Sequence, residues 1–271
     1  MIQLGQYPAA SHVIAHVSDT HLLAGGRPLY GKVNTIDHLA QALAQLERSI
    51  AKPEAIVFTG DLADLGEPDA YVRLREIVEP VAERMGATII WVMGNHDERA
   101  DYSRLLFDQE SDAPQDRVYD INGLRIISFD TTVPGYHHGE VADDQLDWLA
   151  DVLASPAKHG TLLAVHHPPI PTPLLEVPVS VASATCYTLD LSAVDRVLSG
   201  VDFGQSVNIV HVYDDQLVHS IIPVGDTAEV TGVPAAGWEQ IAAMTPEQRI
   251  DTFSRKNSAF NSGEAETSGN A

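Results

Sequence analysis

The chain of 271 residues is long enough for one large α/β domain or two small ones, and its 44% hydrophobic and 20% charged residues are typical of a globular protein. Its 38 acidic and 16 basic residues give a formal net charge of −22, which argues against binding to nucleic-acid polymers. A small phosphate ester beside metal ions is not excluded by that charge. The sequence has no apolar run of the roughly 18 residues that a membrane helix needs and no signal-peptide pattern. Together with the single cysteine, Cys186, these features predict a cytoplasmic protein.

The first part of the chain alternates between short apolar runs that predict strands and longer runs with helical spacing. The predicted strands cover residues 12–17, 55–58, 88–93, 117–121, 124–129 and 161–165. The predicted helices lie between them, at residues 36–50, 71–81, 98–107 and 146–153. Asn122 and Gly123 separate two adjacent strand runs and predict a hairpin turn. This alternation is typical of an α/β sheet with helices on its faces.

The pattern changes after Pro178. Residues 179–183, 207–213 and 217–222 predict strands with no long helix between them, and therefore a second, antiparallel sheet, with the run after Pro178 at an edge. From about residue 257 the chain is rich in Gly, Ser, Asn and Glu, a composition that predicts disorder. We therefore expect a main domain over residues 1–225 and a C-terminal extension over residues 226–271.

Four of the predicted strands end in residues that bind hard or borderline metal ions. The segments are VSDTH, FTGDLAD, VMGNHDE and AVHHPP, and the residues are Asp19, His21, Asp61, Asn95, His96 and His166. The carboxyl ends of strands in an open α/β sheet form a ligand crevice, so these side chains are expected to meet. A mixture of carboxylate, imidazole and amide oxygen suits Mn, Fe or Zn. A carboxylate such as Asp61 can bridge two ions about 3.5–4 Å apart.

The motifs SDTH, GDLAD, GNHDE and HHPP, in this order, resemble those of the calcineurin-like metallophosphoesterases. The surrounding segments, including VFTGDLADLGEPDAY and NIVHVYDDQLVHS, are similar to actinobacterial class III 3′,5′-cyclic nucleotide phosphodiesterases over residues 12–225. The resemblance implies a two-sheet αββα sandwich, two bound metal ions (Fe, Mn or Zn) and homodimerisation. It also implies that a metal-bound hydroxide attacks a cyclic phosphodiester such as cAMP and yields a 5′-nucleotide.

The same resemblance implies a role for each motif residue. It assigns Asp19 and His21 to the first metal ion, Asp61 to both ions as a bridge, and Asn95 and His166 to the second ion. It makes His96 the catalytic residue that stabilises the transition state or protonates the leaving oxygen. Substrate contacts are expected from His21, Asn95 and His137, the last on the loop PGYHHGE. Asp64 and Asp97 are expected to cap helices or orient ligands.

One motif of the family is missing from this sequence. The family carries Gly-His-x-His at the end of another strand after HHPP, and its two histidines complete the two metal spheres. Here PPIPTPLLE runs directly into VPVSVASATCY, so the domain is shortened near residues 171–178 by a helix, a strand and two ligands. About eleven residues remain, too few for a crossover connection.

The missing motif predicts weakened metal binding and low activity. His211 and His219 are alternative ligands. In the family, however, the segment around them occurs together with an intact Gly-His-x-His motif, which favours a structural role for the two histidines. Two other functions stay open. One is a non-catalytic relative that binds a nucleotide or a partner protein, and the other is a phosphoesterase of broader specificity.

Overall fold

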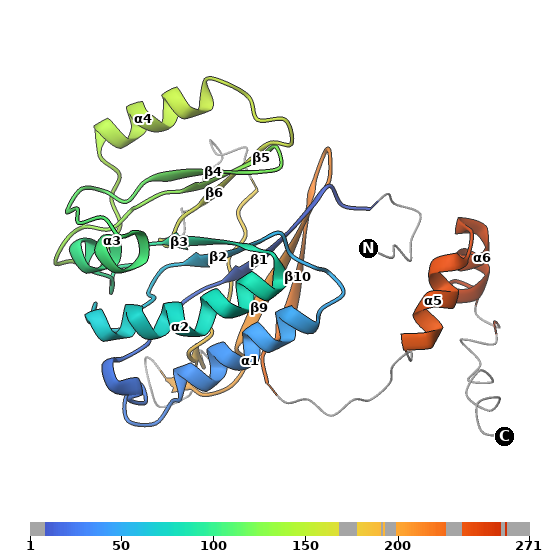
Figure 1. The fold of residues 1–271 in the computed structure, drawn as a ribbon, viewed down its shortest axis with the longest axis horizontal. Helices are drawn as coiled ribbons and strands as arrows, with labels where there is room; N and C mark the ends of the chain where they lie inside the picture. Colours follow the sequence, from blue (N-terminus) through green and yellow to red (C-terminus); the bar gives the residue numbers. More distant parts are fainter. Residues whose placement is uncertain are drawn as a thin grey trace. The chain divides into compact units, whose positions relative to one another are not determined.

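The computed structural model describes residues 9–167, 178–190, 192, 199–225, 235–255 and 258 (Figure 1). The chain divides into one unit of residues 11–225 and a second that combines residues 1–10 with 226–271. In the second unit the described residues form two short helices, α5 (Ala235–Ala243) and α6 (Pro246–Phe253). The predicted disorder beyond residue 257 and the predicted shortening near residues 171–178 fall outside the described residues, apart from residues 258 and 178.

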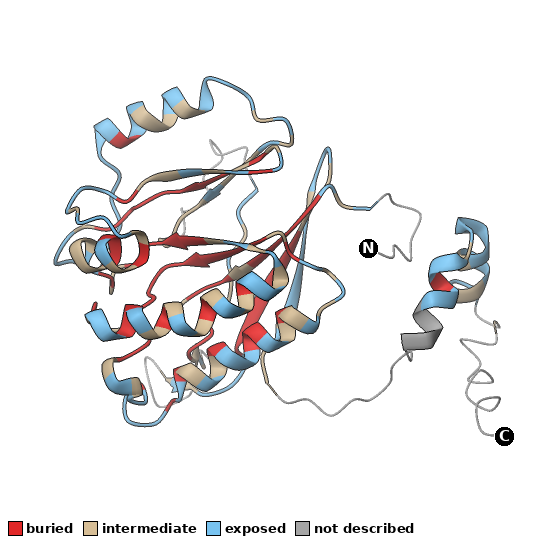
Figure 2. Cartoon of the chain, in the orientation of Figure 1, coloured by how far each residue is buried: buried red, intermediate tan, exposed pale blue. Residues whose placement is uncertain are grey.

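The first unit contains a five-stranded sheet with the order β10-β9-β1-β2-β3. Its parallel part consists of β1 (His12–Val17), β2 (Ala55–Thr59) and β3 (Thr88–Val92), and its antiparallel part of β9 (Ser206–Val212) and β10 (Leu217–Pro223). Every residue of β2 is buried, as expected for a parallel strand covered on both faces. Burial runs along the middle of the sheet and falls off at β10 (Figure 2).

A smaller sheet with the order β4-β5-β6 lies beside the first (Figure 1). It is built from β4 (Arg117–Ile121), β5 (Leu124–Ser128) and β6 (Thr161–Ala164). The predicted hairpin turn between β4 and β5 is confirmed, since Asn122 and Gly123 have φ angles of 53° and 99° and the two strands pair antiparallel. Strand β6 pairs with β5 in parallel.

Helices cover the outer faces of the two sheets. Figure 1 shows α1 (Thr35–Arg48) and α2 (Pro68–Met85) along the five-stranded sheet and α4 (Asp143–Leu153) beyond the smaller one, while α3 (Arg99–Phe107) packs against α2. The rings of Phe129 and Trp148 stack between the smaller sheet and α4. The predicted αββα sandwich is confirmed, and its core lies between the sheets, around Ile14, Val57, Ile90, Ile121, Ile126 and Val210.

Two predictions for the second half of the chain are wrong. Residues 179–183 form no strand, although Val179 and Val181 favour extended structure. Strands β9 and β10 do pair with each other antiparallel, but they extend the first sheet through β1 instead of forming a sheet of their own. The pattern of apolar residues predicts strands but not their partners, which lie far away in the sequence. The remaining short elements are a 3-10 turn, η1 (Ala24–Gly26), and a two-stranded ladder, β7 (Thr188–Leu189) with β8 (Gly200–Val201).

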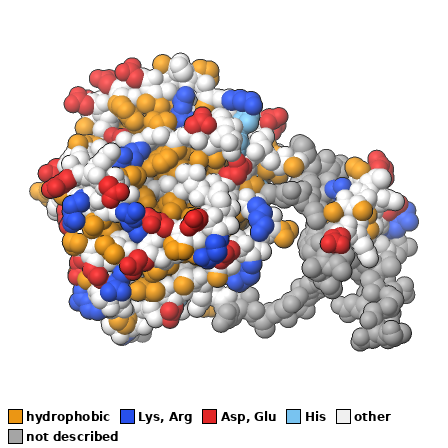
Figure 3. All heavy atoms as spheres, in the orientation of Figure 1, with side chains coloured by type: hydrophobic (Ala, Val, Ile, Leu, Met, Phe, Trp, Pro, Cys, Tyr) orange, Lys and Arg blue, Asp and Glu red, His pale blue; other side chains and the backbone are white. Residues whose placement is uncertain are grey.

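The surface carries both signs of charge. On the face seen in Figure 3, Lys and Arg side chains are interspersed with Asp and Glu and do not gather into one basic patch. Within the described ranges the model contains no helix that is both long enough and apolar enough to span a bilayer.

Two buried tyrosines of α2 and α3 differ in their hydrogen bonds. The hydroxyl of Tyr71 donates to Asp97 Oδ1 over 3.0 Å and accepts from the backbone N–H of Glu98 over 3.1 Å. The hydroxyl of Tyr102 is buried and, among the described residues, has no hydrogen-bond partner. The two rings meet edge to face with their centroids 6.3 Å apart, so the two side chains share one environment.

We expect Tyr71→Phe to lower the free energy of unfolding by about 1 to 2 kcal/mol, because it removes two hydrogen bonds and leaves a buried donor without a partner. Tyr102→Phe is the matched control and should leave the stability unchanged or raise it slightly, because it removes a buried hydroxyl without a protein partner. Urea unfolding of the two variants and the parent measures the difference. Equal losses from both substitutions would contradict this account.

Candidate active site

The predicted site residues follow the carboxyl ends of four strands. Asp19 and His21 follow β1, Asp61 follows β2, Asn95 and His96 follow β3, and His166 follows β6. Asp19, His21 and Asp61 have φ angles of 55°, 44° and 49°, in the left-handed region that non-glycine residues rarely adopt. Such strained conformations persist where the surrounding structure fixes them, and they are frequent at functional sites. Here they turn the chain sharply and bring the three side chains together.

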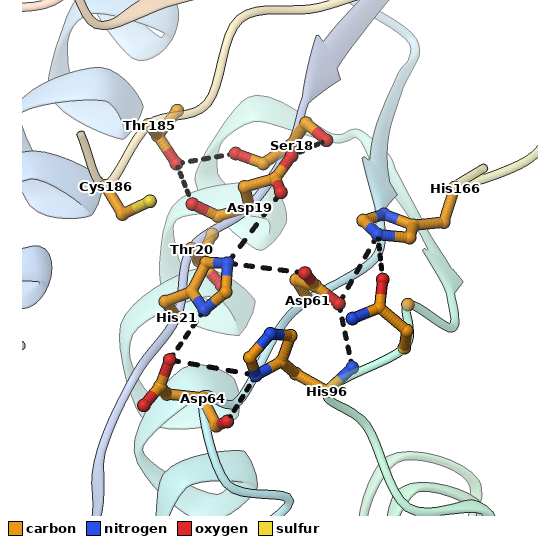
Figure 4. Close-up of polar contacts among 12 residues, drawn as sticks. Ser18, Asp19, Thr20, His21, Asp61, Asp64, His96, His166, Thr185 and Cys186 are labelled. Atoms are coloured by element: carbon orange, nitrogen blue, oxygen red, sulfur yellow. Dashed lines mark hydrogen bonds and ion pairs between the residues drawn. The ribbon is translucent and has the colours of Figure 1, made fainter. Parts of the chain in front are cut away.

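Asp61 stands at the centre of the cluster (Figure 4). Its Oδ2 lies 3.4 Å from Nε2 of His21, and its Oδ1 lies 3.4 Å from Nε2 of His166. Oδ1 also accepts the backbone N–H of His96 over 3.0 Å. The same Nε2 of His21 also lies 3.8 Å from Oδ1 of Asp19. The two oxygens of one carboxylate therefore face two different histidines.

The donor set fits metal ions. His21, Asp61 and His96 form one group whose ligand atoms all lie within 4.8 Å of one another, and Asp19, Asp61 and His166 form a second such group. Asp61 belongs to both. In addition, Oδ1 of Asn95 lies 3.1 Å from Nε2 of His166 and offers an amide oxygen on that side. Carboxylate, imidazole and amide oxygen are ligands of Mn, Fe and Zn, and a shared carboxylate is the ligand that two adjacent ions need.

The carboxylates of the cluster attract positive charge. Burial alone would lower the pKa of His21, but contacts with Asp19, Asp61 and Asp64 raise that pKa well above its ordinary value. Burial likewise opposes charge on His166, and Asp61 raises the pKa of His166 to about 9. Burial would raise the pKa of Asp61, yet His166 and His21 lower it far below its usual range. The site is therefore built to hold cations, and metal ions would take the place of the imidazole protons.

Hydrogen bonds at the other ring nitrogens orient the two central histidines. Nδ1 of His21 donates to Oδ1 of Asp64 over 2.9 Å, and Nδ1 of His166 donates to the carbonyl oxygen of Thr59 over 2.7 Å. Each bond leaves Nε2 free to face Asp61, which is how metal-binding histidines are commonly held. The role expected of Asp64 in orienting a ligand agrees with this contact. The Thr59 carbonyl was not anticipated, because a backbone acceptor leaves no signal in the sequence.

Asp97 fixes the two loops that carry Asp61 and Asn95. Its side chain is buried and accepts backbone N–H groups from Leu62, Ala63 and Gly94 over 3.1, 3.1 and 2.9 Å, and the hydroxyl of Tyr71. Burial raises the pKa of Asp97 to about 6, partly offset by the backbone donors. The carboxylate thus ties the loop after β2 to the loop after β3.

Thr185 and Cys186 hold the end of β1 from the other side. The backbone N–H groups of these residues donate to the carbonyl oxygens of Ser18 and Asp19 over 2.9 and 3.1 Å. The Thr185 hydroxyl also donates to the Ser18 carbonyl oxygen over 2.9 Å (Figure 4). Cys186 is buried, and burial raises the pKa of its thiol to about 11. The cysteine therefore serves packing and not thiolate chemistry.

The loop after β5 brings only one of its two histidines to the cluster. Nδ1 of His137 accepts a hydrogen bond from Nδ2 of Asn95 over 2.8 Å, and the His137 ring centroid lies 5.1 Å from that of His96. His138 contacts Glu140 instead. His137 therefore lies beside Asn95 and His96, and its contact with substrate stays a prediction.

His167, His211 and His219 lie outside the two ligand groups. His167 contacts Thr131 Oγ1 and the carbonyl oxygen of His137, over 2.8 and 3.2 Å. Neither His211 nor His219 belongs to the two ligand groups formed by the described residues. The geometry thus gives no sign that either one replaces the missing histidine pair.

Comparison with known proteins places these residues in a family context. The family model described as calcineurin-like phosphoesterase matches residues 12–203. A cAMP/cGMP dual specificity phosphodiesterase of Mycobacterium tuberculosis is 47% identical over 264 positions, which cover 83% of each chain. A probable cyclic nucleotide phosphodiesterase of Rhodococcus erythropolis is 43% identical, over 83% of this chain and 87% of its own. A 3′,5′-cyclic adenosine monophosphate phosphodiesterase of Pseudomonas aeruginosa is 32% identical over 60% of this chain and 57% of its own.

The lengths of the two longest of these matches are informative. Because 83% of 271 residues is about 225, a match of 264 positions includes roughly 40 at which this chain has no residue. A strand with its crossover helix occupies about 30 residues. A shortfall of this size is large enough to hold one helix–strand unit.

Two glycines allow the loops after β2 and β3 to touch. A Cβ atom on Gly94 would lie 2.1 Å from the backbone nitrogen and 2.3 Å from Oδ1 of Asp61. A Cβ atom on Gly60, which has a φ of 87°, would lie 2.6 Å from Nδ1 of His166. Side chains at these positions would push the central carboxylate and a histidine out of place.

We expect Gly94→Ala to abolish metal binding at the cluster, because the added methyl group must displace Asp61. Gly86→Ala is the control: its Cβ would meet no atom within 4 Å, and the substitution costs only the left-handed conformation, about 1 kcal/mol. Titration with Mn²⁺ followed by calorimetry, together with a circular dichroism check of folding, measures the effect. A folded Gly94→Ala protein with unchanged Mn²⁺ affinity would show that Asp61 is not the central ligand.

Proposed function

Since the chain belongs to the calcineurin-like phosphoesterase family, we propose that it is a metal-dependent phosphodiesterase that hydrolyses 3′,5′-cyclic nucleotides such as cAMP to 5′-nucleotides. The observation that carries the proposal is the pair of ligand groups that share Asp61 at the ends of four strands. The names of the relatives from M. tuberculosis and R. erythropolis support the choice of substrate, because those proteins match most of this chain.

Each of two ions would be held on one side of Asp61. Nε2 of His21 faces Oδ2 of Asp61, and Nε2 of His166 faces Oδ1. Asp19 beside His21 would add a ligand for the first ion and Asn95 beside His166 one for the second, while Asp19 also forms a ligand group with Asp61 and His166. When bound, such ions polarise the phosphoryl oxygens and lower the pKa of water at the site. Asp64 and the Thr59 carbonyl would keep the two imidazoles in the tautomer that binds metal.

His96 and His137 are placed to act on the substrate. Nδ1 of His96 donates to the carbonyl oxygen of Asp64 over 2.6 Å, so a second proton on this ring must reside on Nε2. A protonated His96 can therefore release the Nε2 proton to the leaving oxygen of the ester. His137, exposed on the neighbouring loop and bonded to Asn95, is available to contact the phosphate.

The chemistry should be weaker than in a relative with the complete set of ligands. The sequence lacks the Gly-His-x-His motif, and the shortfall of roughly 40 positions in the matches supports the loss of a whole structural unit. Each ion would keep three or fewer protein ligands, and loss of supporting residues alone can weaken metal sites 10- to 100-fold. We propose that both metal affinity and turnover are reduced for this reason.

The direct test measures metal content by mass spectrometry and cAMP hydrolysis in the same purified sample, with and without added Mn²⁺. We expect fewer than two tightly bound metal ions per chain and hydrolysis that depends on the added Mn²⁺. Absence of hydrolysis at saturating Mn²⁺ would refute the proposed activity. Two tightly bound ions with hydrolysis independent of added metal would refute the weakening.

His96→Ala separates catalysis from metal binding. If His96 supplies the proton, the variant should lose about 100-fold or more in kcat, with the Mn²⁺ affinity unchanged. His138→Ala is the control, because His138 contacts Glu140 and no residue of the cluster. A loss of Mn²⁺ affinity in His96→Ala would instead make His96 a ligand.

A further inference from the structure

A large cavity opens beside the candidate metal site. Its volume is about 720 Å³, within the range of small-molecule binding sites, and Asp19, Asn95 and His166 line one part of it. It extends between the inner face of the five-stranded sheet and strands β5 and β6. The cavity and the cluster around Asp61 therefore form one continuous space in which a ligand can reach both.

The walls of the cavity continue the core between the two sheets. Ile14, Val57 and Val210 line it from the larger sheet, and Ile126, Leu162 and Ala164 line it from the smaller one. The same residues belong to the core cluster or pack against it. In the described part of the chain β6 is the last strand of its sheet, so on this side no further strand fills the space between the sheets.

The lining combines an aliphatic wall with two sets of polar groups. Most of the wall is aliphatic, and the described residues that line it include no Phe, Tyr, Trp, Lys or Arg, so its aromatic rings are the imidazoles of His16, His166, His167 and His219. Polar groups include Ser18, Thr59 and His16 beside Asp19, and Nε2 of His16 contacts Thr59 Oγ1 over 2.8 Å. A second polar pair, His219 and Ser180, is already joined by a 2.8 Å hydrogen bond.

This lining selects among ligands. A nucleobase needs hydrogen-bond partners for its edge and gains from an aromatic ring to stack on. The aliphatic part of the wall offers neither, and such groups occur only among the histidines and the other polar residues of the lining. An alkyl chain needs only apolar surface and gains free energy with each methylene that it buries. The contrast favours a ligand with a phosphate head and an aliphatic tail.

We propose that this cavity is a binding site for the aliphatic ester arm of phosphodiester substrates. The inference rests on the proposed function, since it places the phosphate at the ligand groups around Asp61. The substrate class is then extended from compact cyclic nucleotides to alkyl phosphodiesters, whose tail lies along Val210 and Leu162 between the sheets.

The test uses alkylphosphonates, whose tetrahedral phosphorus head group presents oxygens to metal ions as a phosphate does and whose C–P bond is not hydrolysed. Binding of ethylphosphonate and hexylphosphonate to the full chain is measured by calorimetry at saturating Mn²⁺. The four added methylenes should tighten binding of hexylphosphonate about tenfold or more over ethylphosphonate. Equal affinity of the two ligands, or no binding of either, would overturn the proposal.

Two variants locate the tail. Val210→Phe adds bulk inside the cavity and should reduce the preference for hexylphosphonate to within about threefold. Val218→Phe is the matched control, because Val218 is 42% exposed on the neighbouring strand and does not line the cavity. This variant should prefer hexylphosphonate to the same extent as the parent. Ala164→Leu fills the cavity from the opposite sheet and serves the same purpose if Val210→Phe does not fold. An unchanged preference in a folded cavity variant would place the tail elsewhere and overturn the proposal.

Hydrolysis of cAMP in the same preparations distinguishes this inference from the proposed function. A protein that hydrolyses cAMP but shows no dependence on chain length would retain the proposed activity and lose the tail site. A protein that prefers hexylphosphonate but does not hydrolyse cAMP would retain the tail site and lose the proposed activity.

Discussion

The arrangement of the site depends on one buried carboxylate. Asp97 accepts three backbone N–H groups and one hydroxyl from the loops after β2 and β3 and from α2. Backbone donors in such loops have no ladder partner, so a buried charge that accepts several of them satisfies groups that would otherwise be costly to bury. The same bonds set the distance between two strand ends. Without that distance, Asp61 and Asn95 would not both reach Nε2 of His166.

The geometry of the cluster follows from this contact. With the two loops tied together, Gly60 and Gly94 approach too closely for any side chain, and Asp61 is pressed into a left-handed conformation between His21 and His166. The strained backbone and the negative charge of Asp61 have the same consequence. The carboxylate can point each of its oxygens at a different imidazole, and the raised pKa values of both histidines reflect the negative potential that a metal ion would neutralise.

Much of this arrangement could be predicted from the sequence, because strand ends and their motifs are local features. Asp19, His21, Asp61 and Asn95 follow apolar runs that form parallel strands of one sheet, and such strands bring their ends together. His166 also follows an apolar run, but its strand, β6, belongs to the smaller sheet. The Asn122-Gly123 turn is equally local. Partners far apart in the sequence could not be predicted in this way. Three features depend on tertiary contacts that the periodicity of apolar residues does not predict. They are the pairing of β9 with β1, the lack of a strand at residues 179–183 and the contact of the Thr59 carbonyl oxygen with His166.

We propose that a single shortening of the chain links the weakness proposed for the metal site to the cavity. A strand next to β6 would both carry ligands to the cluster and fill the space between the sheets, so its loss would remove chemistry and create volume at the same place. The aliphatic walls agree with this origin, because they are core residues that also line a cavity. Apolar surface that lines an open cavity is costly in water, and a ligand that covers it recovers that free energy. The proposed shortening, which would weaken turnover of a compact cyclic ester, would therefore favour binding of a phosphodiester with an aliphatic tail.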